Sequence, residues 1–250
     1  MITQYAFIET LRVRGIFVGP AFLIGLLYLI ELSFWSTATN DNPIGHYNRA
    51  DIIHYILWSV LVFQLTTVAG LTDSLSEYIE EGQIELFLLL PKNLLVFFLQ
   101  YGVGQLLARI FLFSPFILGV IFFSGTSPTL WLLPAFLLAG LIINICFTFA
   151  LSCLTFKFRD AYAFVIIKDT LAWMLSGALI PLDLFPLVFQ RVFQFLPFQY
   201  IAFMPTQVAL GIFNWRSFIP LLIVLISMIL IANILWLRLS KSNQGYSNHD

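Results

Sequence analysis

The chain has 250 residues, of which 60% are hydrophobic and only 10% are charged. Soluble domains carry charge on about a quarter of their residues, so this composition excludes a soluble globular domain. It predicts an all-α integral membrane protein, with residues 1–250 forming a single transmembrane domain. The 12 basic and 13 acidic residues nearly cancel, which argues against a nucleic-acid-binding surface.

The first element in the chain is ITQYAFIETLRVR. Ile2, Tyr5, Ile8 or Glu9, and Arg12 recur there at helical spacing. This pattern suits a short amphipathic helix that lies along the inner membrane surface before the first span.

Six apolar runs are each long enough to cross the hydrocarbon core, which requires about 20 residues of helix. They lie near 16–36, 53–71, 104–124, 130–154, 161–181 and 217–237. We therefore expect six transmembrane helices, and an even number of spans places both termini on the same side of the membrane.

Basic residues predict which side that is, because cytoplasmic loops carry an excess of Lys and Arg. With the N-terminus inside, the cytoplasmic basic residues are Arg12, Arg14, Lys92, Lys157, Arg159, Arg238 and Lys241. The outer ones are Arg49, Arg191 and Arg216. The asymmetry predicts an N-in, C-in topology.

An acidic segment, LTDSLSEYIEEGQIELFLLLPKN, lies between the second and third runs. Ser74 and Glu77 fit a capping box at the start of a cytoplasmic helix. Glu77, Glu81 and Glu85 repeat every four residues, with Glu80 beside them. Two interpretations stay open: the stripe is a solvated helix face, or it meets a basic surface on a partner.

A proline-rich segment, residues 175–205, lies between the fifth and sixth runs. It is apolar and rich in phenylalanine, yet it contains Pro181, Pro186, Pro197 and Pro205. Proline removes a backbone donor and interrupts a helix, so a straight span is excluded. We expect a re-entrant outer hairpin of short helices, because irregular backbone is tolerated at membrane depth only against protein or a water-filled cavity.

Four charged residues fall inside the expected spans: Glu31, near the outer end of the first span, and Arg109, Lys168 and Asp169 deeper in theirs. Each costs about 2.5–3.5 kcal/mol on insertion scales, so such residues are functional candidates. Sequence neighbours point about 100° apart on a helix, which argues against a simple Lys168–Asp169 pair and makes Arg109 a candidate partner for Asp169. Structural ion pairs or snorkelling are one interpretation; a place near a subunit boundary, where substrate could sense the charges, is the other.

Cysteine and histidine give no metal-site or catalytic pattern. Cys146 and Cys153 share one apolar run without other ligands nearby, so we interpret them as small packing residues. We therefore predict no metal site and no catalytic residue.

Two parts of the chain together match one known class of membrane protein. In the acidic segment the matching positions are Glu77, Ile79, Gly82, Ile84, Glu85 and LLLP at 88–91. After the fifth run they are SG at 176–177, PL at 181–182, FP at 185–186 and LPF at 196–198, continued by Pro205 and Gly211. With six expected spans, the whole chain resembles the permease subunits of type-2 ABC exporters.

The resemblance implies a cytoplasmic coupling helix that docks on a separate ATPase. Its contact residues would be Glu77, Ile79, Glu80, Glu81, Gly82, Glu85 and Pro91. The outer hairpin that the resemblance implies is marked by Ser176, Gly177, Pro181, Pro186, Pro197 and Pro205.

The same resemblance implies the assembly. Two copies of an ABC ATPase would bind ATP and Mg, and a second permease, identical or related, would complete the path. This chain lacks GxxxxGK[ST], so phosphate binding belongs to the partner, and we expect this chain to bind no cofactor and to have no enzymatic activity. The implied function is export of an amphipathic or hydrophobic substrate across the bacterial cytoplasmic membrane, with membrane lipid around the permease.

Two alternatives remain. An intramembrane enzyme could use Ser176, but no histidine lies within a span to act as its base. A secondary transporter would usually show inverted repeats and discontinuous helices, and the sequence shows neither.

Overall fold

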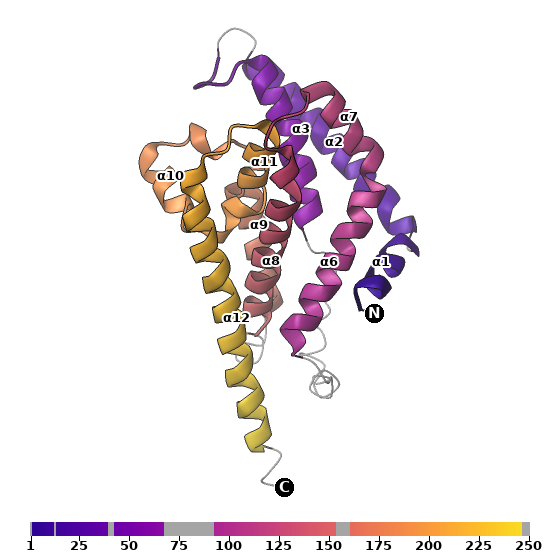
Figure 1. The fold of residues 1–250 in the computed structure, drawn as a ribbon, viewed down its shortest axis with the longest axis vertical. Helices are drawn as coiled ribbons and strands as arrows, with labels where there is room; N and C mark the ends of the chain where they lie inside the picture. The colour runs from indigo at the N-terminus through magenta and orange to yellow at the C-terminus, as the bar shows by residue number, and fades with distance from the viewer. Residues whose placement is uncertain (1, 13, 40–42, 68–92, 154–160, 247–250) are drawn as a thin grey trace.

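The computed structural model describes residues 2–12, 14–39, 43–67, 93–153 and 161–246, and helices without any β-strand make up most of them. Figure 1 shows an elongated helical bundle, with α12 along one side and extending toward the C-terminus. The elements are α1 (Ile2–Arg12), α2 (Arg14–Ala38), α3 (Arg49–Thr66), α6 (Leu94–Leu112), α7 (Ser114–Ser124), η1 (Leu130–Leu132), α8 (Leu133–Ser152), α9 (Ala161–Leu175), η3 (Leu182–Leu184), α10 (Leu187–Phe193), η4 (Pro197–Tyr200), α11 (Phe203–Leu210), η5 (Trp215–Ser217) and α12 (Phe218–Tyr246).

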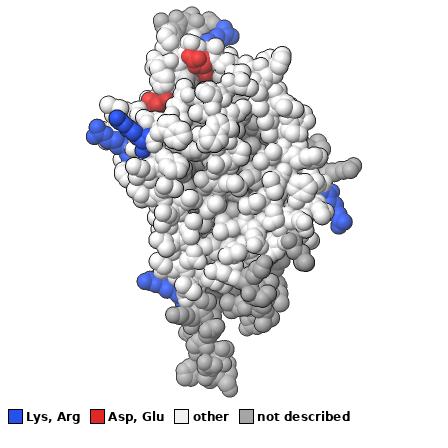
Figure 2. All heavy atoms as spheres, in the orientation of Figure 1, with Lys and Arg blue, Asp and Glu red and all other residues white. Residues whose placement is uncertain are grey.

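The described helices have the character of a multi-pass membrane protein. Three of them are long and apolar enough to cross a membrane: Leu94–Leu112, Leu130–Ser152 and Trp215–Arg238. In Figure 2, charged side chains are few and a broad uncharged surface covers the middle of the visible face. The count of six spans and the N-in, C-in topology stay predictions.

The expected third span at 104–124 is wrong, because two helices divide that region. α6 begins well before residue 104, since the Asn93 side chain accepts a hydrogen bond from the backbone of Leu95 and caps the helix. α7 is separate because Pro115 cannot donate to the carbonyl one turn earlier. The Ser114 hydroxyl donates instead to the carbonyl of Phe111, at 2.7 Å.

The other apolar runs map onto helices with shifted ends. The run near 53–71 corresponds to α3, which begins after a capping box at Asn48 and ends at Thr66. The run at 130–154 is confirmed as η1 and α8. α9 ends at Leu175, before the expected residue 181, and α12 continues beyond the expected end to Tyr246.

The expected N-terminal helix is present as α1, and it packs along α6. Ala6 is fully buried, and the Tyr101 hydroxyl donates to the Glu9 carboxylate at 2.8 Å. At Gly104 an added Cβ would lie 2.4 Å from the backbone oxygen of Thr3, so only glycine permits this approach. The position of α1 relative to a membrane surface stays a prediction.

The apolar core lies around α3 and α8. Trp58, Phe98, Leu141 and Phe149 are each at most 2% exposed. The proline-rich segment joins this core at Gly140 of α8, where an added Cβ would meet the carbonyl oxygen of Tyr200 at 2.4 Å. The segment after α9 therefore packs directly against the backbone of α8.

Candidate functional site

α3 ends inside the bundle, beside the middle of α8, and its last carbonyls need donors from elsewhere. Arg109 of α6 donates to the carbonyl of Gln64 at 3.0 Å and also to that of Thr67. The Asn144 amide of α8 donates to the carbonyl of Thr66 at 3.1 Å. A cation at a helix C-terminus also interacts favourably with the helix dipole.

Lys168 extends this arrangement from α9. Its side chain is only 4% exposed and donates to Asn144 Oδ1 at 3.1 Å and to Thr148 Oγ1 at 2.9 Å. Its Nζ also lies 2.6 Å from the carboxylate of Asp169, which is 55% exposed. We call this arrangement the polar belt: the side chains of Arg109, Asn144, Thr148, Lys168 and Asp169, with the α3 carbonyls of Gln64, Thr66 and Thr67 that Arg109 and Asn144 bind.

The expected pairing of Arg109 with Asp169 is not found. Asp169 pairs instead with its sequence neighbour Lys168. The angular argument against that pair was wrong because the long, flexible lysine stem reaches around the helix while the buried amine bonds to α8. Asn144 and Thr148 were missed from the sequence, although their spacing of four places both on one face of α8.

A second helix ends inside the bundle, where α9 gives way to the bend at 176–179. All four carbonyls of the bend accept hydrogen bonds. The donors, in order along the chain, are the Phe203 backbone N–H (2.8 Å), the Tyr55 hydroxyl (2.5 Å), the Ser59 hydroxyl (3.0 Å) and the Trp35 indole (3.2 Å). Ser176 is fully buried, and Gly177 has φ +82°, a conformation that glycine adopts without steric cost.

The proline-rich segment consists of short helices, as the prolines predict. Pro181 precedes η3, Pro186 precedes α10, and Pro197 begins η4. Pro205 falls in the first turn of α11, where a backbone N–H has no intrahelical partner. The placement of this hairpin in or on the outer leaflet stays a prediction.

Asp183 joins the proline-rich segment to the residues just before α3, and the sequence analysis missed it. Its carboxylate accepts from the Tyr47 hydroxyl at 2.8 Å and the Gln207 amide at 3.5 Å, and lies 3.2 Å from Nε2 of His46. Burial and the neighbouring carboxylate raise the pKa of Tyr47 above its usual range, so its hydroxyl stays a donor. A lone acid within an apolar, proline-rich stretch was the available signal.

Asp183, held by these contacts, borders a cavity of about 260 Å³. The cavity lies among η3, α10, α11 and the residues leading to η5, and its described lining includes Asp183 and five side-chain amides: Gln190, Gln194, Gln199, Gln207 and Asn214. We call it the outer pocket, after the side of the membrane on which the predicted topology places it.

The expected coupling residues, Glu77, Ile79, Glu80, Glu81, Gly82, Glu85 and Pro91, lie outside the described residues. The described ends of that segment are the belt-bound Thr67 and the helix cap Asn93. Cys146 and Cys153 are buried free thiols. In the described parts of the chain, no three His, Cys, Asp or Glu residues cluster in a way that could hold a metal.

Comparison with known proteins gives one finding. The model of a family described as ABC-2 family transporter protein matches residues 22–247, which is nearly the whole chain. No curated protein matches the chain significantly.

Proposed function

The chain belongs to the ABC-2 transporter family, and we propose that it is the membrane-spanning permease subunit of an ATP-binding cassette exporter. The match over residues 22–247 carries this proposal. Permeases of the family are transport subunits that work with an ABC ATPase. In our proposal that separate subunit, present in two copies, binds ATP and Mg, and an amphipathic or hydrophobic substrate moves outward across the bacterial cytoplasmic membrane.

The exposed side of α9 supports a second permease, identical or related. Asp169 is 55% exposed near the middle of a helix whose exposed side chains include Ile166, Ile167 and Met174. A charge at this depth is unfavourable against lipid. We propose that this side of α9 faces the second permease across the substrate path, where the Asp169 carboxylate meets water or protein.

The polar belt supports transmission from the ATPase. Arg109 binds the carbonyl of Thr67, the last described residue before the coupling segment, and belongs to α6, the first described helix after it. The two helices that flank the segment are thus joined by one side chain. A displacement of the segment would move both helices, and Asn144 would pass that movement to α8.

The belt also bears on the secondary-transporter alternative. Such transporters use the carbonyls of interrupted helices to bind coupling ions. At the end of α3, the carbonyls of Gln64, Thr66 and Thr67 already accept hydrogen bonds from Arg109 and Asn144. This arrangement offers no support for an ion site there, and the exporter proposal is the one we retain.

The acidic stripe provides the test. We expect Glu77→Lys combined with Glu81→Lys to leave the permease inserted but to abolish its co-purification with the ATPase. The reason is that several like charges facing each other across a contact cost several kcal/mol. Asp250→Lys, a charge reversal outside the segment, is the control and should retain the ATPase. A stable complex of the double variant with normal substrate-stimulated ATP hydrolysis would show that the stripe is a solvated face.

A further inference from the structure

The outer pocket has the chemistry of a ligand site rather than of a packing defect. Side-chain amides both donate and accept hydrogen bonds, and five of them line this one cavity. Phe193, Phe203 and Phe213 add apolar surface between the polar groups. A pocket with convergent polar groups on an apolar wall is the usual form of a small-molecule site.

The wall of the pocket is held in place before any ligand arrives. The Gln190 amide donates to the carbonyls of Asp183 and Phe185, at 2.9 and 2.7 Å. The Asp183 carboxylate is tethered by Tyr47 and Gln207. In contrast, the side chains of Gln194 and Ser217 make no hydrogen bond within the described residues, and these groups remain available to a ligand.

Charge and size restrict what that ligand can be. Asp183 is the only charged residue among the described lining, so no cation is in place to bind a phosphate or carboxylate. The volume of about 260 Å³ lies just below the range of about 300–1,000 Å³ that is usual for drug-sized ligands. The pocket thus suits one ring or one headgroup.

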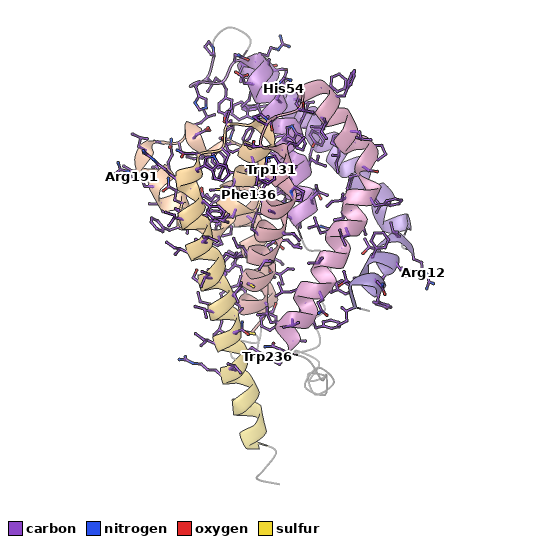
Figure 3. The ribbon with its side chains drawn as sticks, viewed as in Figure 1. Arg12, His54, Trp131, Phe136, Arg191 and Trp236 are labelled. Carbon is purple, nitrogen blue, oxygen red and sulfur yellow. The ribbon has the colours of Figure 1, made fainter. Side chains whose placement is uncertain are left out.

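The position of the pocket suits a headgroup at the membrane surface. Trp131, just before α8, and Trp215, just before α12, are 75% and 61% exposed. Tryptophan is enriched where a membrane meets water. Figure 3 shows His54 toward one end of the bundle and Trp236 near the lower part of α12. The pocket lies at the other end of α12 from Trp236, because it borders the residues at which that helix starts.

We propose that the outer pocket binds an uncharged, hydroxyl-rich group such as a single sugar ring. Hydroxyls donate and accept like the amides that would meet them, and the faces of phenylalanine rings carry partial negative charge that attracts the C–H groups of a sugar. That the ring is the headgroup of the exported amphipath rests on the proposed function; the binding itself does not.

The test uses the permease with its ATPase in nanodiscs of phosphatidylglycerol, because maltoside and glucoside detergents would compete for the pocket. Methyl glucoside is titrated, and binding is followed by tryptophan fluorescence and by saturation-transfer NMR. Trp215 is the reporter, since its ring stacks edge-on against Phe213 of the pocket with centroids 5.3 Å apart. We expect saturable binding, with a fluorescence change that Trp215→Phe removes while the NMR signal persists.

Gln194→Leu should weaken methyl glucoside binding about three- to tenfold, the effect of one lost hydrogen bond. Gln4→Leu, which alters an exposed glutamine on α1, should leave binding unchanged. Absence of saturable binding, binding of phosphocholine instead, or equal affinity in Gln194→Leu and the unaltered protein would overturn the proposal. If the ATPase is retained but no sugar binds, the permease proposal stands and the pocket assignment fails. If the sugar binds saturably but the ATPase is not retained, the pocket assignment stands and the permease proposal fails.

Discussion

α3 and α9 both end inside an apolar bundle, and the two ends obtain their hydrogen bonds in different ways. At the end of α3 the donors are the Arg109 guanidinium and the Asn144 amide, with Lys168 bound behind that amide. At the end of α9 the donors are neutral: a tyrosine, a serine, a tryptophan and one backbone N–H.

The two helix ends differ in how the stabilising free energy of their hydrogen bonds is divided among the donors. A hydrogen bond to a charged group contributes about 1.5–3 kcal/mol and a neutral one about 0.5–1.5 kcal/mol. The end of α3 therefore takes the larger part of its hydrogen-bond free energy from one charged residue, Arg109, with Asn144 adding a neutral bond, whereas the end of α9 spreads its hydrogen bonds over four neutral donors. The α3 end is the junction expected to carry movement, and the α9 end is the junction expected to hold the outer hairpin still.

The largest expected effect is that of Arg109→Met. Two carbonyls lose their donor, so the free energy of unfolding should fall by about 3 kcal/mol, measured by SDS titration in mixed micelles. Arg109→Lys should lose less, because it keeps the charge although an ammonium lacks the planar fork of a guanidinium. Arg12→Met, at the exposed end of α1, is the control. A loss no larger than that control would show that the charge does not hold α3.

An intermediate effect is expected for Lys168→Met, about 2 kcal/mol by the same titration, because the oxygens of Asn144 and Thr148 lose their buried donor. Adding Asp169→Asn should restore part of that loss, since the carboxylate is then no longer unpaired. The restored part should be small, because the Asp169 carboxylate is 55% exposed and solvent screens its charge. If the double variant is less stable than the single one, Asp169 has a partner other than Lys168.

The smallest effects are expected at the neutral end. Tyr55→Phe and Ser59→Ala each remove one donor to the bend after α9 and should each cost about 1 kcal/mol. Tyr5→Phe, on an exposed ring, is the matched control. Thermal unfolding followed by circular dichroism would detect the difference. A loss from Tyr55→Phe that equals that of Arg109→Met would contradict the distinction between the two ends.

Several elements could be predicted from the sequence because their signals are local. Leu133–Ser152 was predicted by its uninterrupted apolar run, and the short helices after α9 by their prolines. The prediction of a single span at 104–124 was wrong because hydropathy is continuous across Pro115 and does not show where one helix ends and the next begins. The start of α6 is determined instead by the Asn93 cap. The functional role expected for Arg109, Lys168 and Asp169 stays a prediction, whereas the partner expected for Asp169 was wrong, since the carboxylate pairs with Lys168.

The sequence by itself determined the membrane class, the family and the positions of the charged residues within the apolar runs. These follow from transfer free energies and from motifs that each segment carries alone. Only the tertiary structure decided that α3 ends beside Asn144, that Arg109 binds this end, and that Asp183 is tethered next to a pocket of amides. The physical reason is that a buried carbonyl or carboxylate takes its partner from whichever helix packs against it, and residues far apart in the chain supply those partners.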